Sequence, residues 1–350
     1  MPADTITFPW ETPPPEGEPR EVLPGLSWLR MPLPMALDHV NCWILDDPAQ
    51  DGVTIVDTGI DSEHGRALWE QALGGRRVAQ VIVTHHHPDH MGLAGWFAET
   101  HGARLFMSRA AYLMGRILQL DRQERPSSET LSFWHVSGMD PDELALRREE
   151  RPFHLGDVTC PLPLEYVRLL EGMQLQAGGI WWTVRMGEGH GPEHATLWSE
   201  TNDVVIGGDQ VLPTISANVS VYVTEPQADP LTDWLASCER LMGFARAETF
   251  ALPGHGLPYR GLPRRFQQMI DGHAGALDRL EAHLAKPHLA ADCFSVLFRR
   301  KVGRSEYGLA LGEALAHCLH LWHMGRATRE TDPDGRWLFR AAPELDGTER

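Results

Sequence analysis

The stretch from Val78 to His90 reads VAQVIVTHHHPDH and joins an apolar run to a cluster of histidines. The apolar part, Val78–Thr84, is continuous rather than alternating, which predicts a strand buried on both faces of a sheet. Four side chains that can bind a metal follow within six residues, in the pattern His85-x-His87-x-Asp89-His90. Loops at the carboxyl ends of strands are where α/β proteins expose their sites. The stretch therefore predicts an α/β fold with a metal site at the end of a buried strand.

The spacing of these ligands divides them into two positions. In an extended chain, side chains two residues apart point the same way, so His85 and His87 can share one metal ion. A turn through Pro88 then directs Asp89 and His90 towards a second position. Imidazole and carboxylate together suit zinc, with iron or manganese as alternatives. The intervening residue of the run, His86, is expected to face solvent or to support the ligands from behind.

Short strands and helices alternate on both sides of this stretch, which is typical of an α/β architecture. Before it, a helix is expected after Asp61 or Ser62 and should stop at Gly74–Gly75. The strands predicted around it cover residues 21–31, 39–45, 53–57, 104–107, 166–170, 180–186, 195–198, 203–207 and 249–252.

Composition changes along the chain predict three parts. Residues 1–20 contain Pro13–Pro15, which favours a flexible N-terminal arm. Residues 21–262 form the catalytic domain, with a helical insertion at about 109–155. Residues 263–345 form a small C-terminal domain of helices and a hairpin, whose turn is predicted at Asp332–Gly335. Helices followed by a small hairpin are similar to a winged-helix unit.

The charge and the cysteines limit the partners and the compartment. Among 350 residues, 31 Lys and Arg stand against 48 Asp and Glu, for a net charge of -17. Such a field repels phosphate backbones, so nucleic acid is not an expected partner. No run of about 18 apolar residues is present, so we expect no membrane span. The N-terminus lacks a secretory pattern, and five scattered cysteines suggest buried thiols in a reducing compartment, which predicts a cytoplasmic protein.

Further pieces downstream make the chain resemble the metallo-β-lactamase superfamily, in particular its glyoxalase-II-like branch, over residues 20–262. The pieces occur in the family's order. They are His190 in GEGHGPEH (187–194), Asp209 in IGGD (206–209), His255 in LPGHG (252–256) and Asp57 in VDTG (56–59).

The resemblance implies an αββα four-layer sandwich and two divalent metal ions. One ion would be held by His85, His87, His190 and Asp209. The other would be held by Asp89, His90, His255 and a shared Asp209. Asp57 and His194 would support the ligands from the next layer, and no cysteine takes a ligand position.

The activity implied by the resemblance is hydrolysis by a hydroxide shared between the two metals. The expected substrate is a small ester, thioester or lactone, and Asp89 is a candidate proton acceptor. The donor of a proton to the leaving group is not identified, with Tyr166 and Tyr222 as candidates. Glu188 and Glu193 predict an acidic rim, which argues against a glutathione thioester. Two interpretations of a further set of residues stay equally open: they line an apolar acyl pocket, or they form a local core. These residues are Tyr112, Met114, Phe133, Trp134, Met139, Trp181 and Trp182.

Three alternatives stay open. The C-terminal unit is similar to an extension found on a branch that includes an endoribonuclease, and a short basic cluster at Arg299, Arg300, Lys301 and Arg304 would suit a metal-dependent endoribonuclease or phosphodiesterase. A single iron in the same ligands would suit a sulfur dioxygenase. A non-catalytic binding module is the third. A separate histidine series on a C-terminal helix, namely His317, His320 and His323, is expected to lie on a partly exposed face without completing a metal site.

Overall fold

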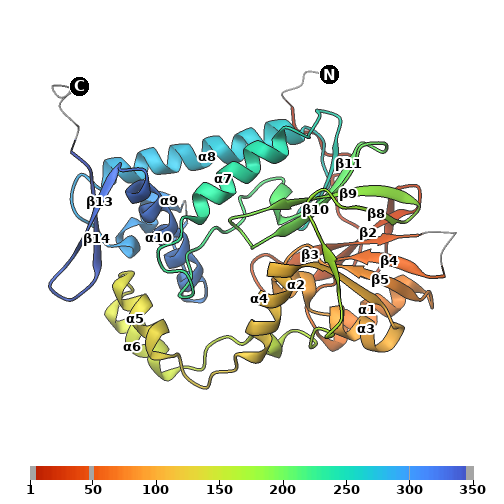
Figure 1. The fold of residues 1–350 in the computed structure, drawn as a ribbon, viewed down its shortest axis with the longest axis horizontal. Coiled ribbons are helices and arrows are strands. Elements are labelled where there is room, and N and C mark those ends of the chain that lie inside the picture. The colour runs from red at the N-terminus through yellow and green to blue at the C-terminus, as the bar shows by residue number, and fades with distance from the viewer. Residues whose placement is uncertain (1–4, 47–50, 299, 344–350) are drawn as a thin grey trace. The chain divides into compact units, whose positions relative to one another are not determined.

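A seven-stranded sheet carries the histidine run. In the computed structural model, which describes residues 5–46, 51–298 and 300–343, its strands are ordered β1 to β7. They span Arg20–Leu23 (β1), Leu26–Pro32 (β2), His39–Leu45 (β3), Val53–Val56 (β4), Val78–Ile82 (β5), Arg104–Ser108 (β6) and Val167–Leu169 (β7). Strands β1 to β4 pair antiparallel, and β4 to β7 pair parallel. The predicted buried strand is therefore β5, in the parallel part of the sheet (Figure 1).

A second sheet of five strands faces the first. Its order is β12-β11-β10-β9-β8, and its strands span Gln174–Ala177 (β8), Ile180–Gly187 (β9), His194–Ser199 (β10), Val204–Gly208 (β11) and Phe250–Pro253 (β12). Side chains from both sheets form one buried cluster, in which Trp28 and Trp43 of the first sheet join Trp182 and Leu197 of the second. This apolar layer fixes the distance between the two sheets and hence between the loops at their ends.

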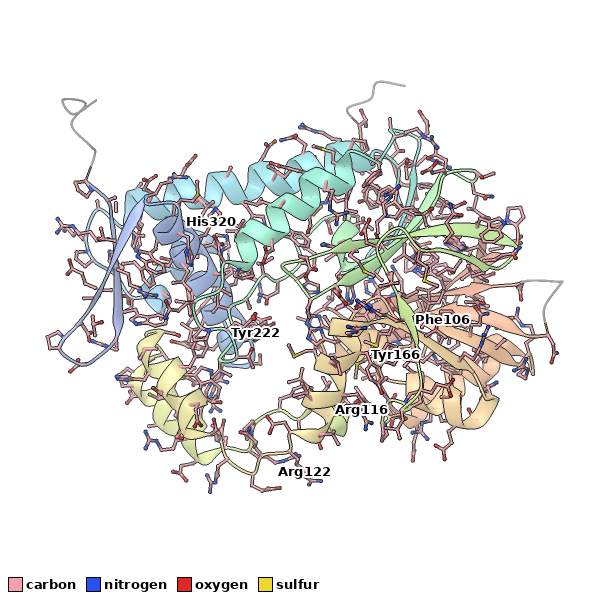
Figure 2. All side chains as sticks on the ribbon, viewed as in Figure 1. Phe106, Arg116, Arg122, Tyr166, Tyr222 and His320 are labelled. Atoms are coloured by element: carbon pink, nitrogen blue, oxygen red, sulfur yellow. The ribbon has the colours of Figure 1, made fainter. Side chains whose placement is uncertain are left out.

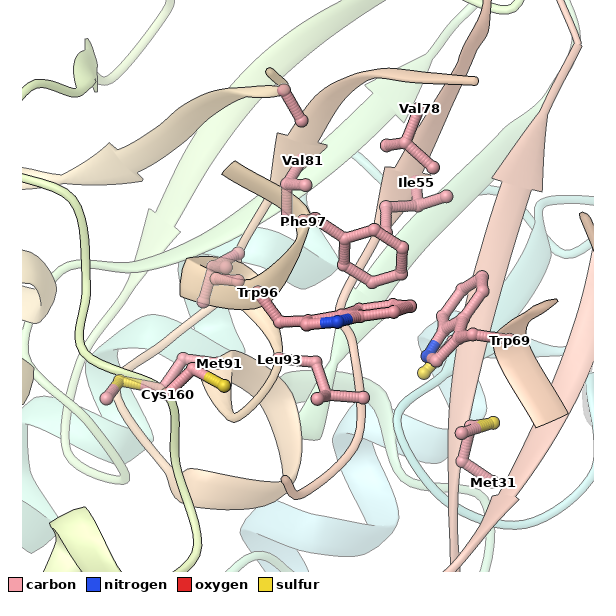
Figure 3. Close-up of a cluster of buried hydrophobic side chains, with 14 of the residues drawn as sticks. Met31, Ile55, Trp69, Val78, Val81, Met91, Leu93, Trp96, Phe97 and Cys160 are labelled. Carbon is pink, nitrogen blue, oxygen red and sulfur yellow. The ribbon is translucent and has the colours of Figure 1, made fainter. Parts of the chain in front are cut away.

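Helices α1 (Glu63–Leu73) and α3 (Ala94–His101) cover the outer face of the first sheet. Trp69 of α1 meets Phe97 of α3 edge to face at 5.2 Å, above Ile55 and Val81 of the sheet (Figure 3). The helix predicted after Ser62 is present. The Ser62 hydroxyl caps this helix by accepting a hydrogen bond from the backbone of the first helical turn.

Parts of two helices cover the second sheet. These are the end of α7 (Pro230–Met242) and the start of α8 (Leu262–His283). Ser237 of α7 accepts a hydrogen bond from the Glu188 amide just after β9, and the Arg265 guanidinium of α8 donates to the Leu212 carbonyl. The order helix, sheet, sheet, helix confirms the predicted αββα sandwich.

Contacts divide the chain into two units. The first comprises 1–122, 153–217 and 237–267, and the second comprises 123–152, 218–236 and 268–350. The segment predicted as one insertion is therefore divided, since α4 (Arg109–Leu120) belongs to the first unit and α5 (Ser128–Val136) and α6 (Pro141–Glu149) to the second.

The second unit also contains a long buried helix, α10 (Tyr307–His323), and the hairpin of β13 (Ala327–Thr331) and β14 (Trp337–Ala341). Its short elements are η3 (Ala290–Cys293), α9 (Phe294–Leu297) and η4 (Arg304–Glu306). The turn predicted from the Asp-Pro-Asp-Gly sequence joins the two strands, and the Asp332 carboxylate accepts hydrogen bonds from the amides of Asp334 and Arg336. The likeness of this unit to a winged helix stays a prediction.

The segment before β1 is attached to the first unit over residues 5–19, whereas the sequence predicts a flexible arm. Thr7 pairs with Arg260 as an isolated bridge, and Trp10 packs against Trp28 and Phe250. Aromatic burial outweighs the effect of the three prolines here. Residues 1–4 of the predicted arm lie outside the described residues.

Two smaller expectations concern cysteines and membranes. All five cysteines are buried and unpaired, as predicted. None of the helices in the described part of the chain is long and apolar enough to cross a bilayer.

Candidate metal centre

The candidate ligands stand at strand ends of both sheets. Residues 85–90 follow β5 and enter the short helix α2 (Pro88–Met91). From the second sheet, His190 lies between β9 and β10, Asp209 follows β11 in the 3-10 turn η2 (Asp209–Val211), and His255 follows β12. The two sheets thus bring together residues that are up to 170 positions apart in sequence.

The first group comprises His85, His87, His190 and Asp209. Each offers one ligand atom, and these atoms lie within 4.8 Å of one another. The His85 Nε2 and His87 Nδ1 atoms are 2.9 Å apart, and His190 Nε2 lies 3.3 Å from Asp209 Oδ2. One ligand atom of His85 and one of His87 therefore belong to the same group.

The second group comprises Asp89, His90 and His255, with ligand atoms again within 4.8 Å. The other oxygen of Asp209, Oδ1, is 3.4 Å from both His90 Nε2 and His255 Nε2. One carboxylate therefore faces both groups, which is the arrangement a bridging ligand requires.

Electrostatics divide the imidazoles into two kinds. Burial, with neighbouring histidines, holds the pKa values of His85 and His87 well below the ordinary value, so both are neutral and can ligate. Burial also opposes charge on His90 and His255. There the carboxylates of Asp89 and Asp209 outweigh burial and raise the pKa of His90 to about 9 and that of His255 to about 11. The second group thus concentrates negative potential where it favours a cation.

These residues fit a pair of divalent metal ions. The Nε2 atom of the fully buried His90 makes no hydrogen bond within the described residues, although a buried polar atom normally has a partner. Neutral imidazole and carboxylate are the donor set that zinc and iron accept.

Asp57 lies behind the candidate ligands and contacts two of the residues that follow β5. Its carboxylate accepts hydrogen bonds from the Thr84 amide at 2.8 Å, the Thr84 hydroxyl at 2.9 Å and His90 Nδ1 at 2.7 Å. The Thr84 oxygen lies 3.0 Å from His85 Nδ1 and can accept its proton. With their Nδ1 atoms held in this way, His85 and His90 present Nε2 to the metal groups.

His194 and His86 lie next to the ligands without joining either group. His194 is buried, stacks on His85 with ring centroids 4.5 Å apart, and its Nε2 accepts a hydrogen bond from the Asp209 amide. His86 is also buried, and burial lowers its pKa to about 4, so the solvent-facing alternative for this residue is wrong. The chain bends from Thr84 to His87 before α2 begins, so the run is not extended at His86.

The carboxylates of Glu188 and Glu193, from which the sequence predicts an acidic rim, both accept hydrogen bonds from backbone amides. Glu193 accepts a hydrogen bond from the Ala110 amide at the start of α4, and Arg168 lies 3.8 Å from it. Glu188 accepts a hydrogen bond from the Glu193 amide. Both side chains therefore stabilise the loop and helix beside the site.

The aromatic residues do not form one pocket. Trp182 is buried between the sheets and Trp181 is mostly exposed, because neighbouring residues of a strand face opposite ways. Tyr112 stacks on Tyr166 at 3.9 Å and donates its hydroxyl to Pro163, so Tyr112 belongs to the local core. Figure 2 shows Tyr166 beside α4, the helix that carries Arg116.

Other predicted residues belong to the second unit, including Phe133, Trp134, Met139 and Tyr222. The histidines of α10 differ from expectation, since His317 and His320 are buried and only His323 is exposed. His320 also has an acidic partner that sequence spacing did not reveal, because its Nδ1 lies 3.0 Å from Asp229 Oδ1. Among the described residues these histidines form no group of three metal ligands.

Two members of the basic cluster are paired with acidic side chains. Arg300 makes two hydrogen bonds to Glu306, and Arg304 contacts both Glu143 and Glu150. Arg299 lies outside the described residues, and no contact of Lys301 supports a role in binding nucleic acid.

Sequence reasoning missed two residues at the start of β3. His39 and Asn41 contact the loop that carries His255. They are among the first residues of an otherwise apolar strand, so no local sequence pattern distinguishes them. Only their hydrogen bonds to a distant loop reveal them.

A family model for the metallo-beta-lactamase superfamily matches residues 35–282, which include every candidate ligand. The chain belongs to the metallo-beta-lactamase superfamily. A second model, for a metallo-beta-lactamase-like C-terminal domain, matches residues 277–342.

Known members of the superfamily extend this assignment. A beta-lactamase domain protein from Burkholderia ambifaria has a solved structure that is 39% identical, with a TM-score of 0.87, covering 96% of this chain and 98% of that one. A probable metallo-hydrolase from Bacillus subtilis (strain 168) is 26% identical over 298 residues, 83% of this chain and 89% of that protein. The predicted metal-dependent hydrolase of this superfamily is confirmed. Support for the glyoxalase-II-like branch is weaker, since a hydroxyacylglutathione hydrolase from Pseudomonas aeruginosa (strain LESB58) is 34% identical over only 98 residues, 27% of this chain and 37% of that protein.

Proposed function

We propose that the protein is a dinuclear hydrolase that cleaves a small ester, thioester or lactone. The observation that carries the proposal is the position of Asp209, whose two oxygens face two separate groups of ligands. His85, His87 and His190 would hold one ion with Asp209, and Asp89, His90 and His255 would hold the other. When bound, two divalent ions supply Lewis acidity and a nucleophile activated from water. We propose zinc, because neutral imidazole with carboxylate suits it.

The residues of the chain have separate tasks in this proposal. Asp57 fixes the orientation of His90, and Thr84 fixes that of His85. Asp89 has the more accessible carboxylate of the two acids, with 16% of its side chain exposed against 8% for Asp209. We therefore assign to Asp89 the acceptance of the proton that water releases.

A thioester is favoured among the three substrate types by one similarity. The hydroxyacylglutathione hydrolase from Pseudomonas aeruginosa (strain LESB58), whose name describes an acylglutathione substrate, is 34% identical to this chain over 98 residues. Hydrogen bonds from backbone amides to Glu188 and Glu193 do not remove the charge of a carboxylate, so the argument from an acidic rim against a glutathione thioester still applies.

The alternatives are less well supported. A nuclease needs basic side chains available to phosphates, whereas Arg300 and Arg304 are paired with acids in a chain of net charge -17. A mononuclear iron dioxygenase has no use for a complete second group of ligands, and here Asp89, His90 and His255 lie together. Five unpaired buried thiols support our proposal of a cytoplasmic location.

The test combines metal analysis with a substrate panel. Protein purified without added metal should contain about two ions per chain and should hydrolyse acyl thioesters or lactones. His87→Ala and Asp209→Ala should lose metal and activity, whereas Asp278→Asn, on the second unit, serves as the matched control. About one iron per chain with oxygen uptake on a persulfide, and no hydrolysis, would replace the proposal with the dioxygenase.

A further inference from the structure

The first residues of β3 lie against the loop that carries His255. The backbone N–H of Asn41 donates a hydrogen bond to the Gly254 carbonyl at 2.7 Å. Its side-chain Nδ2 donates to the carbonyls of Pro253 at 2.9 Å and Gly256 at 2.8 Å. One residue thus donates hydrogen bonds to three backbone carbonyls, on both sides of His255.

The orientation of the Asn41 side chain is itself fixed. Its Oδ1 accepts a hydrogen bond from the indole of Trp28 at 2.7 Å, and both side chains are fully buried. This acceptor contact determines which end of the amide is the donor, so Nδ2 faces the loop. Two carbonyl groups of the loop therefore receive hydrogen bonds from a side chain that water does not reach.

His39, two residues earlier on the strand, contacts the ligand directly. Its carbonyl accepts a hydrogen bond from His255 Nδ1 at 2.5 Å, and its Nε2 accepts one from the Gly256 amide at 2.8 Å. Since Nδ1 of His255 is the donor, its Nε2 is left to face Asp89 and Asp209 at 3.4 Å.

The loop has little room to move without disturbing the other ligands. The Gly254 amide donates to the Gly208 carbonyl at 2.8 Å, directly before Asp209. A side chain at Gly254 would begin 2.3 Å from Asp209 Oδ1 and 2.9 Å from His90. The backbone of this loop therefore forms one wall of the second group, and a shift of the loop would change the distances between ligand atoms.

We infer that Asn41 is a positioning residue for the second metal. It holds the backbone of residues 253–256 so that His255 stands at ligand distance from Asp89 and Asp209, while the His39 carbonyl selects the tautomer. The inference rests on the proposed dinuclear function. Because the loop carries a ligand of the second group and touches the first group only beside the shared Asp209, loss of the Asn41 contacts weakens the second metal site more than the first.

The test uses Asn41→Asp, which has nearly the same shape. The variant keeps an acceptor for Trp28 but places an oxygen where Nδ2 donated, against two carbonyl oxygens. Metal-free full-length protein is titrated with zinc in competition with a chromophoric chelator, and the two binding steps are resolved. His255→Ala and His87→Ala identify which step belongs to which group.

We expect Asn41→Asp to weaken the step lost in His255→Ala by at least tenfold and to leave the step lost in His87→Ala within about threefold. Trp28→Phe, which removes the indole donor to Asn41 together with part of a buried ring, should have a smaller effect on the same step. Asn41→Ser provides a second variant without a new charge and should weaken the same step.

Circular dichroism and thermal unfolding of the metal-free variants separate positioning from a general loss of structure. Wild-type affinity for both ions in the Asn41 variants, or an equal loss at both steps, would overturn the inference. A wild-type protein that binds only one ion would instead reject the dinuclear function, so the two failures are distinguishable.

Discussion

Asp57 has an unusual backbone as well as three hydrogen bonds. Its φ of +59° lies in the left-handed region, which costs a non-glycine residue of order 1 kcal/mol or more. The conformation is maintained because the carboxylate binds Thr84 and His90 on the adjacent parallel strand and its following loop. Local strain at this residue is thus offset by contacts that orient two candidate ligands.

Replacing Asp57 by Asn should weaken metal binding without unfolding the protein. One carboxylate oxygen becomes a donor, so either the contact with His90 Nδ1 or those with Thr84 are lost. We expect metal affinity and kcat/KM to fall by about 10- to 100-fold. Metal titration and steady-state kinetics provide the measurement, and unchanged values in the variant would show that Asp57 does not support the ligands.

Single residues were predictable where their chemistry is concentrated in a motif. His85, His87, Asp89 and His90 stand in one short run, and Asp57 follows a strand with a characteristic turn. Asn41 was not predictable, because its role comes from a loop more than 200 residues later. The contact of Glu193 with the start of α4 was not predictable for a related reason, because nothing in the local sequence distinguishes a carboxylate that caps a distant helix.

At the scale of elements, α4 depends on two caps. The Ser108 hydroxyl accepts a hydrogen bond from the Ala111 amide, and the Glu193 carboxylate accepts one from the Ala110 amide. Acidic groups at a helix N-terminus also interact favourably with the helix dipole. A residue of the loop beside His190 therefore anchors a helix that begins directly after β6.

Removal of the Glu193 cap should destabilise the first unit. Glu193→Ala should lower the free energy of unfolding by about 0.5–2 kcal/mol, as for other lost caps. Glu193→Gln retains an acceptor and should cost less. Urea unfolding followed by circular dichroism measures both, and equal loss in the two variants would assign the effect to charge alone.

A buried histidine pair between α8 and α10 predicts a pH dependence. His317 Nδ1 donates to the Glu313 carbonyl, and its Nε2 lies 3.3 Å from His273 Nδ1. Burial lowers the pKa of His273 to about 3 and that of His317 to about 4. Between these values and about 6.5, the unfolded chain binds more protons than the folded one.

Stability of the second unit should therefore be complete above pH 6.5 and decline as the pH falls towards 4. Each histidine contributes up to about 1.4 kcal/mol per pH unit in this window. His317→Gln should reduce the slope between pH 6.5 and 5, measured by thermal unfolding across that range. A slope equal to that of the wild type would show that His317 accepts a proton without opening the unit.

Elements whose own sequence has a clear hydrophobic pattern were predicted well. Elements that depend on tertiary contacts were predicted less well. The buried strand β5 and the capped helix α1 follow from their own residues. The short strand β8 was not expected, since Gln174–Ala177 alternates polar and apolar residues over only four positions. The burial of His320 was not expected, because its acidic partner Asp229 comes from a distant segment of the chain.

At the scale of the whole molecule, the ligands join two sheets. The first sheet supplies four candidate ligands from one loop, and the second supplies three from separate strand ends. A metal that binds only the folded state adds its binding free energy to stability.

Metal removal should consequently lower the thermal stability of the first unit. For an ion present at 1,000 times its Kd, the loss is about 4 kcal/mol. Treatment with a chelator should lower Tm and added zinc should restore it, as followed by calorimetry. Asp209→Ala, which lacks the shared ligand, should respond little, and a chelator-sensitive Tm in that variant would place the stabilising ion elsewhere.

The division of the ligands between the sheets also has a consequence for biosynthesis. A chain emerging from the ribosome exposes the His85–His90 run long before His255 has been synthesised. Until the second sheet packs against the first, the run supplies only an incomplete set of metal ligands, made of imidazoles and one carboxylate. A hydrolytic centre of this design is therefore silent during translation and becomes active only when the last strand of the sandwich is in place.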